Sequence, residues 1–375
     1  MALSKDRTSA MERIRHVFWA GLIALAVSFS TLLFPLDQLT WIVQSRISDL
    51  EVSGDIIYVG SEQDLTDSAY PSRRSELADM LDYLREAGAD RVYVDMTFDG
   101  PSNAEADGRL NNALRAFDGN AYLVRNLSTG LNGELSLRHS VAGVSASVPY
   151  VGSMRWKNVF GYAWEMPNVV TYRDEQLPSL ATSLAGISPE TEAFPINYSY
   201  ELSSIPTYRF SDLSRPTDSR AVMSSDLVGK VVVVGNLNRA DTNAPNIPGH
   251  IDVPASMVDI YAAETLKAGH TSFIGSRPLL LGALGFLLFI SLLNGRRIRH
   301  AAYGLLPVIQ LASIYVATMF HVRISMADSI FLLLAYGLFR ARANWKRSFR
   351  LVDSETGLPT FAALEADKEV KESVP

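Results

Sequence analysis

The sequence contains no cysteine at all. Its absence excludes a disulfide framework, a thiol nucleophile and a thiolate metal site. Histidine is scarce as well, with six in the chain and no HxH or HExxH spacing that would indicate zinc. The sequence also lacks a GxSxG elbow, a P-loop and a GxGxxG turn. We therefore expect no metal and no cofactor, although a hydrolytic site built from scattered carboxylates stays open.

Charged residues are absent from several long stretches of the chain. Residues 17–36 carry none, and this is about the length that a helix needs to cross a hydrocarbon core of ~30 Å. Further apolar runs occupy 278–294, 301–320 and 324–339. We predict four transmembrane helices, one N-terminal and three C-terminal. The lack of ionisable residues at mid-depth argues against a pump or ion transporter.

The first apolar run also has the position of a secretory signal peptide. It is longer than the apolar part of such a peptide, which is about 7–15 residues, and it has no small-residue cleavage site. We therefore favour an uncleaved membrane helix at residues 17–36.

Basic residues flank the apolar runs and predict their orientation. Residues 1–16 are basic, "GRRIRH" separates the second run from the third, and "RARANWKRSFR" follows the fourth. Such segments are typically cytoplasmic. We expect both termini, residues 1–16 and 340–375, in the cytoplasm of a bacterium. The chain would then be a multi-pass inner-membrane protein with residues 37–277 in the periplasm or outside the cell.

The segment 37–277 is acidic and has the pattern of an α/β domain. It holds 31 acidic and 19 basic residues, and this excess of negative charge argues against a nucleic-acid partner. Apolar runs typical of strands alternate with helical periods, which indicates a mainly parallel sheet with flanking helices. The predicted strands lie at 55–60, 91–98, 121–127, 194–198 and 230–235, and the helices at 72–89, 105–117, 180–185 and 255–269. Residues 135–173 are rich in aromatic and β-branched residues and predict further strands and loops.

Polar residues follow several of these strands. Ligands of open α/β sheets bind beyond the carboxyl ends of the strands. Asp95 and Asp99 share strand parity and could face one cleft as a carboxylate pair. Helix capping or a bond to a loop N–H is the plainer explanation for each carboxylate. The residues that we predict to bind a ligand are Glu62, Arg73, Asp95, Asp99 and Asn236.

The layout of one apolar run, an α/β domain and three further runs resembles that of type-two CHASE sensory domains of bacterial receptors. The stretches that carry the resemblance are "GDIIYVGSEQDL", "YPSRRSELADMLDYLREAGADRVYVDMTFDG", "EADGRLNNAL", "FPINYSY" and "LVGKVVVVGNLNRADTNAPNIPGHIDVPASMVDIYAAETL". The resemblance covers residues 37–277. It implies a periplasmic sensory role with an unknown extracytoplasmic ligand or protein as the stimulus.

The end of the chain resembles a second family. "DSETGLPTFAALEAD" at residues 353–367 is similar to the entrance of GGDEF domains. Asp353, Thr356 and Gly357 fit that pattern, whereas Glu355 and Thr360 depart from it. The resemblance implies a truncated, degenerate output domain within residues 340–375.

The two resemblances together imply a membrane-bound receptor that controls a cyclic-di-GMP output domain. The chain itself is then no enzyme, and the full-length protein is a diguanylate cyclase or a cyclic-di-GMP phosphodiesterase. Membrane lipid and a second copy of the chain are the expected partners, because such outputs act in pairs. A membrane scaffold, a solute-binding module and a tethered periplasmic hydrolase are the alternatives.

Overall fold

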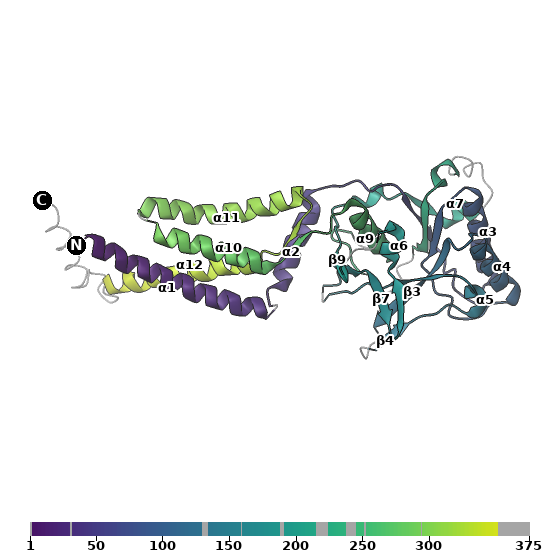
Figure 1. Ribbon diagram of the computed structural model, residues 1–375, viewed down its shortest axis with the longest axis horizontal. Coiled ribbons are helices and arrows are strands. Elements are labelled where there is room, and N and C mark those ends of the chain that lie inside the picture. Colours follow the sequence, from purple (N-terminus) through teal and green to yellow (C-terminus); the bar gives the residue numbers. More distant parts are fainter. Residues whose placement is uncertain are drawn as a thin grey trace. The chain divides into compact units, whose positions relative to one another are not determined.

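The computed structural model describes residues 2–30, 32–129, 134–158, 160–187, 191–214, 224–237, 245–250, 253–293 and 295–351 (Figure 1). The chain divides into two compact units. The helical unit comprises Met1–Val43, Ile274–Phe320 and Ile324–Pro375, and the sheet unit comprises Gln44–Phe273 and His321–Arg323.

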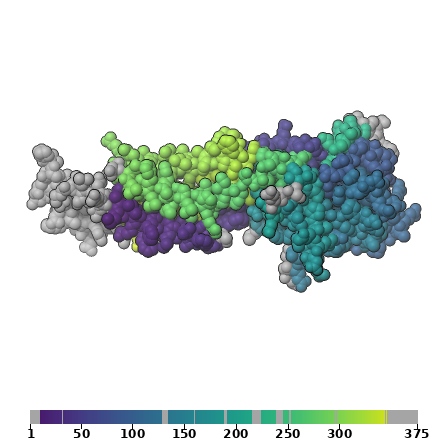
Figure 2. All heavy atoms as spheres, viewed as in Figure 1, coloured from purple at the N-terminus to yellow at the C-terminus, as the bar shows by residue number. Residues whose placement is uncertain are grey.

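The helical unit consists of long helices packed lengthwise. They are α1 (Ala2–Phe29), most of α2 (Phe34–Ile47), α10 (Ser276–Leu292), α11 (Arg296–Met319) and α12 (Ala327–Leu351). Figure 2 shows the side chains of α1, in purple, directly against those of the C-terminal helices, in green. The buried residues at the centre are Val17, Ala20, Ala24, Leu280, Leu287, Ile290, Leu306, Leu332, Ala335 and Tyr336. Small residues such as Ala20 and Ala24 let the helices approach closely.

The outer surface of the helical unit is apolar. Most large side chains that point away from its core are hydrophobic, among them Phe18, Leu22, Phe29, Leu281, Phe289, Leu305, Val308, Leu311, Leu334 and Leu338. A water-facing helix normally shows polar side chains on this outer face. The apolar surface is therefore the kind that contacts lipid or another apolar partner.

By length and apolar composition, one helix in the described part of the chain could cross a membrane by itself, and the bent pair formed by α1 and α2 would be a second if it counts as a single span. Residues Arg297–Met319 of α11 form the single described helix that is long and apolar enough. α10 has 17 residues, which at 1.5 Å per residue falls short of a ~30 Å core. The structure also divides the helix predicted over 17–36, because α1 ends at Phe29 and α2 follows at a bend of 84°. Pro35 lies in the first turn of α2, where its missing N–H is tolerated.

The sheet unit is built on a seven-stranded, mainly parallel sheet with the order β10-β1-β11-β2-β3-β4, in which β5 also pairs with β3. Among the strand pairs that the structure describes in this sheet, only β3 and β4 are antiparallel. The strands are β1 (Ile56–Ser61), β2 (Arg91–Val94), β3 (Ala121–Thr129), β4 (Leu135–Leu137), β5 (Tyr150–Ser153), β10 (Thr207–Arg209) and β11 (Val231–Asn236). The mixed α/β class with a mainly parallel sheet is thus confirmed.

Helices cover both faces of this sheet (Figure 1). On one face lie α3 (Pro71–Glu86), α4 (Ala104–Arg115), α5 (Ala142–Ser145) and α7 (Phe210–Ser214), and on the other α6 (Leu180–Ala185) and α9 (Ser256–Ala268). The central strand β11 is buried on both sides, since Val231, Val232, Val233 and Val234 are all at most 5% exposed. This explains its continuous apolar run, which is typical of a central parallel strand.

Shorter elements complete the sheet unit. They are β6 (Glu165–Pro167), which pairs with β9 (Ala193–Pro195), β7 (Val169–Tyr172), which pairs with β8 (Glu175–Pro178), and the 3₁₀ turn η1 (Leu202–Ser204). The two-residue strands β12 (Phe273–Ile274) and β13 (Arg323–Ile324) lie at the unit boundaries.

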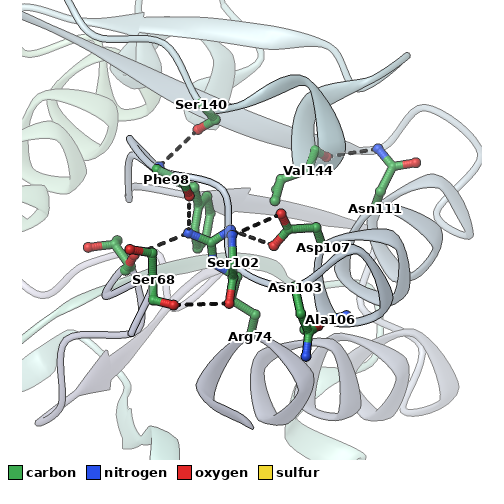
Figure 3. A network of polar contacts seen from close by, with 12 residues as sticks. Ser68, Arg74, Phe98, Ser102, Asn103, Ala106, Asp107, Asn111, Ser140 and Val144 are labelled. Carbon is green, nitrogen blue, oxygen red and sulfur yellow. Dashed lines mark hydrogen bonds and ion pairs between the residues drawn. The ribbon is translucent and has the colours of Figure 1, made fainter. Parts of the chain in front are cut away.

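A buried arginine joins α3 and α4 on one face of the sheet (Figure 3). Arg74 is fully buried, and its Nη1 lies 2.5 Å from Oδ1 of Asp107 on α4. Its Nη2 donates to the carbonyl oxygen of Gly100 at 2.6 Å, and the backbone N–H of Ser102 donates to Oδ2 of Asp107 at 3.2 Å. The Asn103 side chain caps α4 by accepting from the N–H of Ala106. This ion pair therefore fixes the loop after β2 and the start of α4 together.

Candidate functional site

Polar side chains gather at the carboxyl ends of the parallel strands, on the side covered by α9. Several elements supply them: the residue after β2, the strand β3, the end of β5 and the residues after it, and the first turn of α9. We call them the arginine–carboxylate cluster, which comprises Asp95, Asn126, Ser153, Arg155, Ser256 and Asp259. This is the edge of an open α/β sheet at which ligands are expected to bind.

Arg155 is the centre of the cluster because it bonds two carboxylates. Its Nη2 lies 2.6 Å from Oδ2 of Asp95, and its Nε lies 2.5 Å from Oδ2 of Asp259. Asp95 also accepts from the Ser256 hydroxyl at 2.6 Å and from the Asn126 amide at 3.1 Å. The arginine thereby links the sheet edge to α9.

The positions of these residues follow from the strand register. In the parallel pairs, Val94 lies beside both Val234 and Leu123. The residues that follow these three positions therefore lie close together at the carboxyl-end edge of the sheet. A Cβ on Gly235 would lie 2.7 Å from Oγ of Ser256 and 2.8 Å from the hydroxyl oxygen of Tyr58. Real Cβ atoms do not come this close, so glycine at 235 allows the first turn of α9 to approach the sheet.

Burial makes the charges of the cluster costly unless they are paired. The side chains of Arg155, Asp95 and Asp259 are 9%, 4% and 0% exposed. For Asp95, burial opposes ionisation, but Arg155 and the hydrogen bonds of Ser256 and Asn126 together hold the pKa below its ordinary value. For Asp259, burial and the charge of Asp95 outweigh Arg155 and raise the pKa to about 6. The two carboxylates thus share one positive charge, and Asp259 is the one closer to protonation.

The predicted ligand residues are distributed over different surroundings. Asp95 lies in the cluster. Asn236 is the last residue of β11, and its backbone carbonyl oxygen accepts from the Tyr58 hydroxyl at 3.1 Å. The other three lie at the surface, where Glu62 is 3.5 Å from Arg209, Asp99 is 3.6 Å from Arg138, and Arg73 stacks 4.2 Å above the ring of Tyr70.

The proposed carboxylate pair of Asp95 and Asp99 rests on a longer strand than the structure contains. β2 ends at Val94, so the strand predicted over 91–98 stops four residues early and strand parity does not extend to Asp99. Asp95 points to Arg155, whereas Asp99 is exposed beside Arg138.

Sequence reasoning did not find Arg155, Ser153, Ser256 or Asp259. Arg155 follows β5, so the rule that nominated Asp95 applies to it once the bounds of that strand are known. Asp259 gave a different signal, since it is a lone carboxylate within the apolar stretch "MVDIYAA" of a predicted helix. A charged residue in a helix that is buried all round needs a partner.

The geometry of the cluster favours a structural role, in which it holds α9 against the edge of the sheet, over a role in chemical catalysis. Each carboxylate is bonded to Arg155 and to at least one hydroxyl or amide, so neither is presented to solvent as a base. Within the described ranges, no three histidine, aspartate or glutamate side chains are grouped as metal ligands.

Comparison with models of protein families identifies the family of this chain. The sequence model described as CHASE2 domain matches residues 19–294. The chain belongs to the CHASE2 family. CHASE2 domains are sensory domains found in signalling proteins, so this CHASE2 chain has a sensory domain. Neither a curated protein nor a solved structure matches the sequence. The CHASE2 match ends before the GGDEF-like stretch at 353–367, which also lies outside the described residues.

Proposed function

We propose that this protein is a bacterial membrane receptor whose CHASE2 domain lies in the periplasm and controls a cyclic-di-GMP output. The CHASE2 match over residues 19–294 carries the proposal, because it includes the α/β domain together with apolar helices on both sides. The GGDEF-like residues 353–367 suggest the type of output. An extracytoplasmic ligand or protein is the stimulus, and the receptor works as a homodimer.

The apolar outer surface of α1, α10, α11 and α12 supports the placement of this unit in the membrane. Side chains such as Phe289, Leu311 and Leu338 are more than half exposed, and hydrocarbon rather than water suits them. A tilted or bent helix can span with fewer apolar residues than an ideal one. We propose four spans, with residues 37–277 outside the cytoplasm.

The route of the signal starts at α9. Only residues 269–275 separate the end of α9 from the start of α10, and Arg155 bonds the first turn of α9 to the sheet edge. A ligand that favours one arrangement of the sheet edge would change the position of α9 and, through this short connection, α10. The ligand can change the free-energy difference between the two arrangements only by the difference in its binding free energy for them.

The proposed topology predicts a clear labelling pattern. Because the chain has no cysteine, a single cysteine placed at the exposed Arg115 or Arg342 is the only thiol. We expect a membrane-impermeant maleimide to label Arg115→Cys in cells with a permeabilised outer membrane, and to label Arg342→Cys only after lysis. Labelling of Arg342→Cys and protection of Arg115→Cys before lysis would overturn the proposed orientation.

Control of an output domain is tested with a chimera. We would fuse residues 1–351 to an active diguanylate cyclase domain and compare cyclic-di-GMP in cells with that of the same fusion lacking residues 44–273. The expected result is that growth conditions change the product of the full fusion only. An equal response of both fusions would show that the CHASE2 domain does not control the output.

The contacts do not favour a tethered hydrolase. Asp95 is bonded to an arginine in the interior, and Asp99 is separated from it at the surface. A general base must reach the proton that it removes, whereas Asp95 is held by Arg155 and Ser256 in the interior and Asp99 is paired with Arg138.

A further inference from the structure

One end of the helical unit concentrates positive charge. It is formed by the start of α1, the end of α10, the start of α11 and the end of α12. Its described side chains include the arginines at 13, 15, 297, 299, 340 and 342, and Glu12 is the only described carboxylate among them. The two remaining described carboxylates of the unit belong to the opposite end, where Oδ1 of Asp37 accepts from the N–H of Ala327 at the start of α12.

Three of these arginines converge from three helices. The Tyr303 and Tyr336 hydroxyls are 2.6 Å apart and join α11 to α12. Arg299 is four residues before Tyr303 and Arg340 four residues after Tyr336, so each lies one helical turn beyond the tyrosine pair, toward the same end. Arg299 and Arg340 are close enough to Arg13 on α1 for their charges to repel it.

The position of Arg13 is set by contacts with other helices. Its side chain is buried, and its Nε donates to the carbonyl oxygen of Ser291 on α10 at 3.0 Å. One turn further along α1, the His16 ring stacks on Phe339, the neighbour of Arg340. Arg299 Nη1 donates to the carbonyl oxygen of Leu293 at 3.1 Å. These bonds leave guanidinium donors on Arg299 and Arg340 for a ligand, since each guanidinium has five.

The repulsion of Arg13 by Arg299 and Arg340 is relieved if an anion binds between them. Arginine pairs with phosphate through two parallel hydrogen bonds, and basic pockets between membrane helices on the cytoplasmic side suit anionic headgroups. We propose that Arg13, Arg299 and Arg340 form a binding site for the phosphate group of an anionic phospholipid of the inner leaflet. This inference rests on the membrane placement proposed above.

The test uses the full chain, extracted from membranes and purified in a mild detergent. Native mass spectrometry compares the retention of phosphatidylglycerol with that of phosphatidylcholine. In the variant Arg299→Gln/Arg340→Gln, we expect the affinity for phosphatidylglycerol to fall at least about tenfold. The matched control, Arg297→Gln/Arg342→Gln, removes the same charge from two exposed positions and is expected to change the affinity less than about twofold.

Several results would overturn the site. One is an equal loss in both double variants, which would indicate diffuse attraction to the basic end. Another is equal retention of the two lipids by the unchanged chain. A third is that millimolar inorganic phosphate, added in phosphatidylcholine nanodiscs, stabilises the chain as much as phosphatidylglycerol does; the ligand would then be free phosphate.

Two controls separate failure of the site from other failures. The variant Arg299→Lys/Arg340→Lys keeps the charge without the bidentate geometry, so we expect a lipid affinity between those of the unchanged chain and the glutamine variant. Circular dichroism checks the helix content of each variant. If the unchanged chain does not fractionate with membranes, the proposed function falls as well. If it does and the lipid preference is absent, only the phosphate site is wrong.

Discussion

Arg74→Ala is expected to lower the free energy of unfolding of the sheet unit by about 3–5 kcal/mol, because it leaves a buried carboxylate without its partner. Arg74 is fully buried, and Asp107 is 7% exposed at the side chain. The substitution also removes the hydrogen bonds to the carbonyl oxygens of Gly100 and Thr66. A typical domain is stable by only about 5–15 kcal/mol, so the loss is a large fraction of the total.

The neighbouring arginine provides the matched control. Arg73 lies at the surface 3.8 Å from Asp67, and Arg73→Ala is expected to cost less than about 1 kcal/mol. Pulse proteolysis of the full chain in a urea series measures both variants. A similar loss of stability in the two variants would contradict the structural role of Arg74. If Arg74→Ala does not accumulate, Asp107→Asn, which keeps the side-chain volume, tests the same ion pair.

Arg155→Ala is expected to destabilise the sheet unit by about 3–5 kcal/mol at neutral pH, since it leaves two buried carboxylates without a cation. Both Asp95 and Asp259 depend on Arg155 to stay ionised in the interior. The exposed Arg138, which is paired with Asp99, is a suitable control, and Arg138→Ala is expected to change the stability by at most about 0.5 kcal/mol.

The loss caused by Arg155→Ala should depend on pH in a defined direction. The pKa of Asp259 is already about 6 with Arg155 present, and removal of the cation raises it further, together with that of Asp95. A carboxyl group whose pKa is raised in the folded state favours folding when it is protonated, and this contribution is lost as pH rises through the folded-state pKa. The deficit relative to the unchanged chain should therefore be larger at about pH 8 than at about pH 5.

Urea unfolding at the two pH values tests this direction, with Arg138→Ala measured in parallel. A deficit that is equal at both values, or larger at the lower one, would show that the carboxylates are not buried as charges. The triple variant Asp95→Asn/Arg155→Met/Asp259→Asn removes all three charges, and we expect it to recover much of the stability that Arg155→Ala loses.

Much of the fold could be predicted because its strongest elements have local signals. The valine run of β11 and the helical period of α3 each fix a type of structure within a single window of sequence. β1, α4, α6 and α9 were also found close to their observed bounds. The strand predicted over 91–98 was wrong beyond Val94, because the alternating pattern continues into a loop whose apolar residues are buried by other elements. Met96 and Phe98 are 5% and 0% exposed without belonging to a strand.

The candidate site was predicted only in part, because most of it comes from distant segments. Asp95 was found by the rule for strand ends. Arg155 and Asp259, which are separated by 104 positions, have no shared motif. Burial alone distinguishes Arg74 from Arg73, since the two are adjacent and chemically identical.

The sequence by itself determined the composition-level features of this protein: apolar runs on both sides of an acidic α/β segment, a mainly parallel sheet and membership of a sensory family. These features depend on local periodicity and on residue content, which a linear chain displays directly. The tertiary structure alone decided which charges meet. Parallel strands bring their carboxyl ends to one edge, and in that dry interior an unpaired carboxylate is so costly that Arg155 must lie between Asp95 and Asp259.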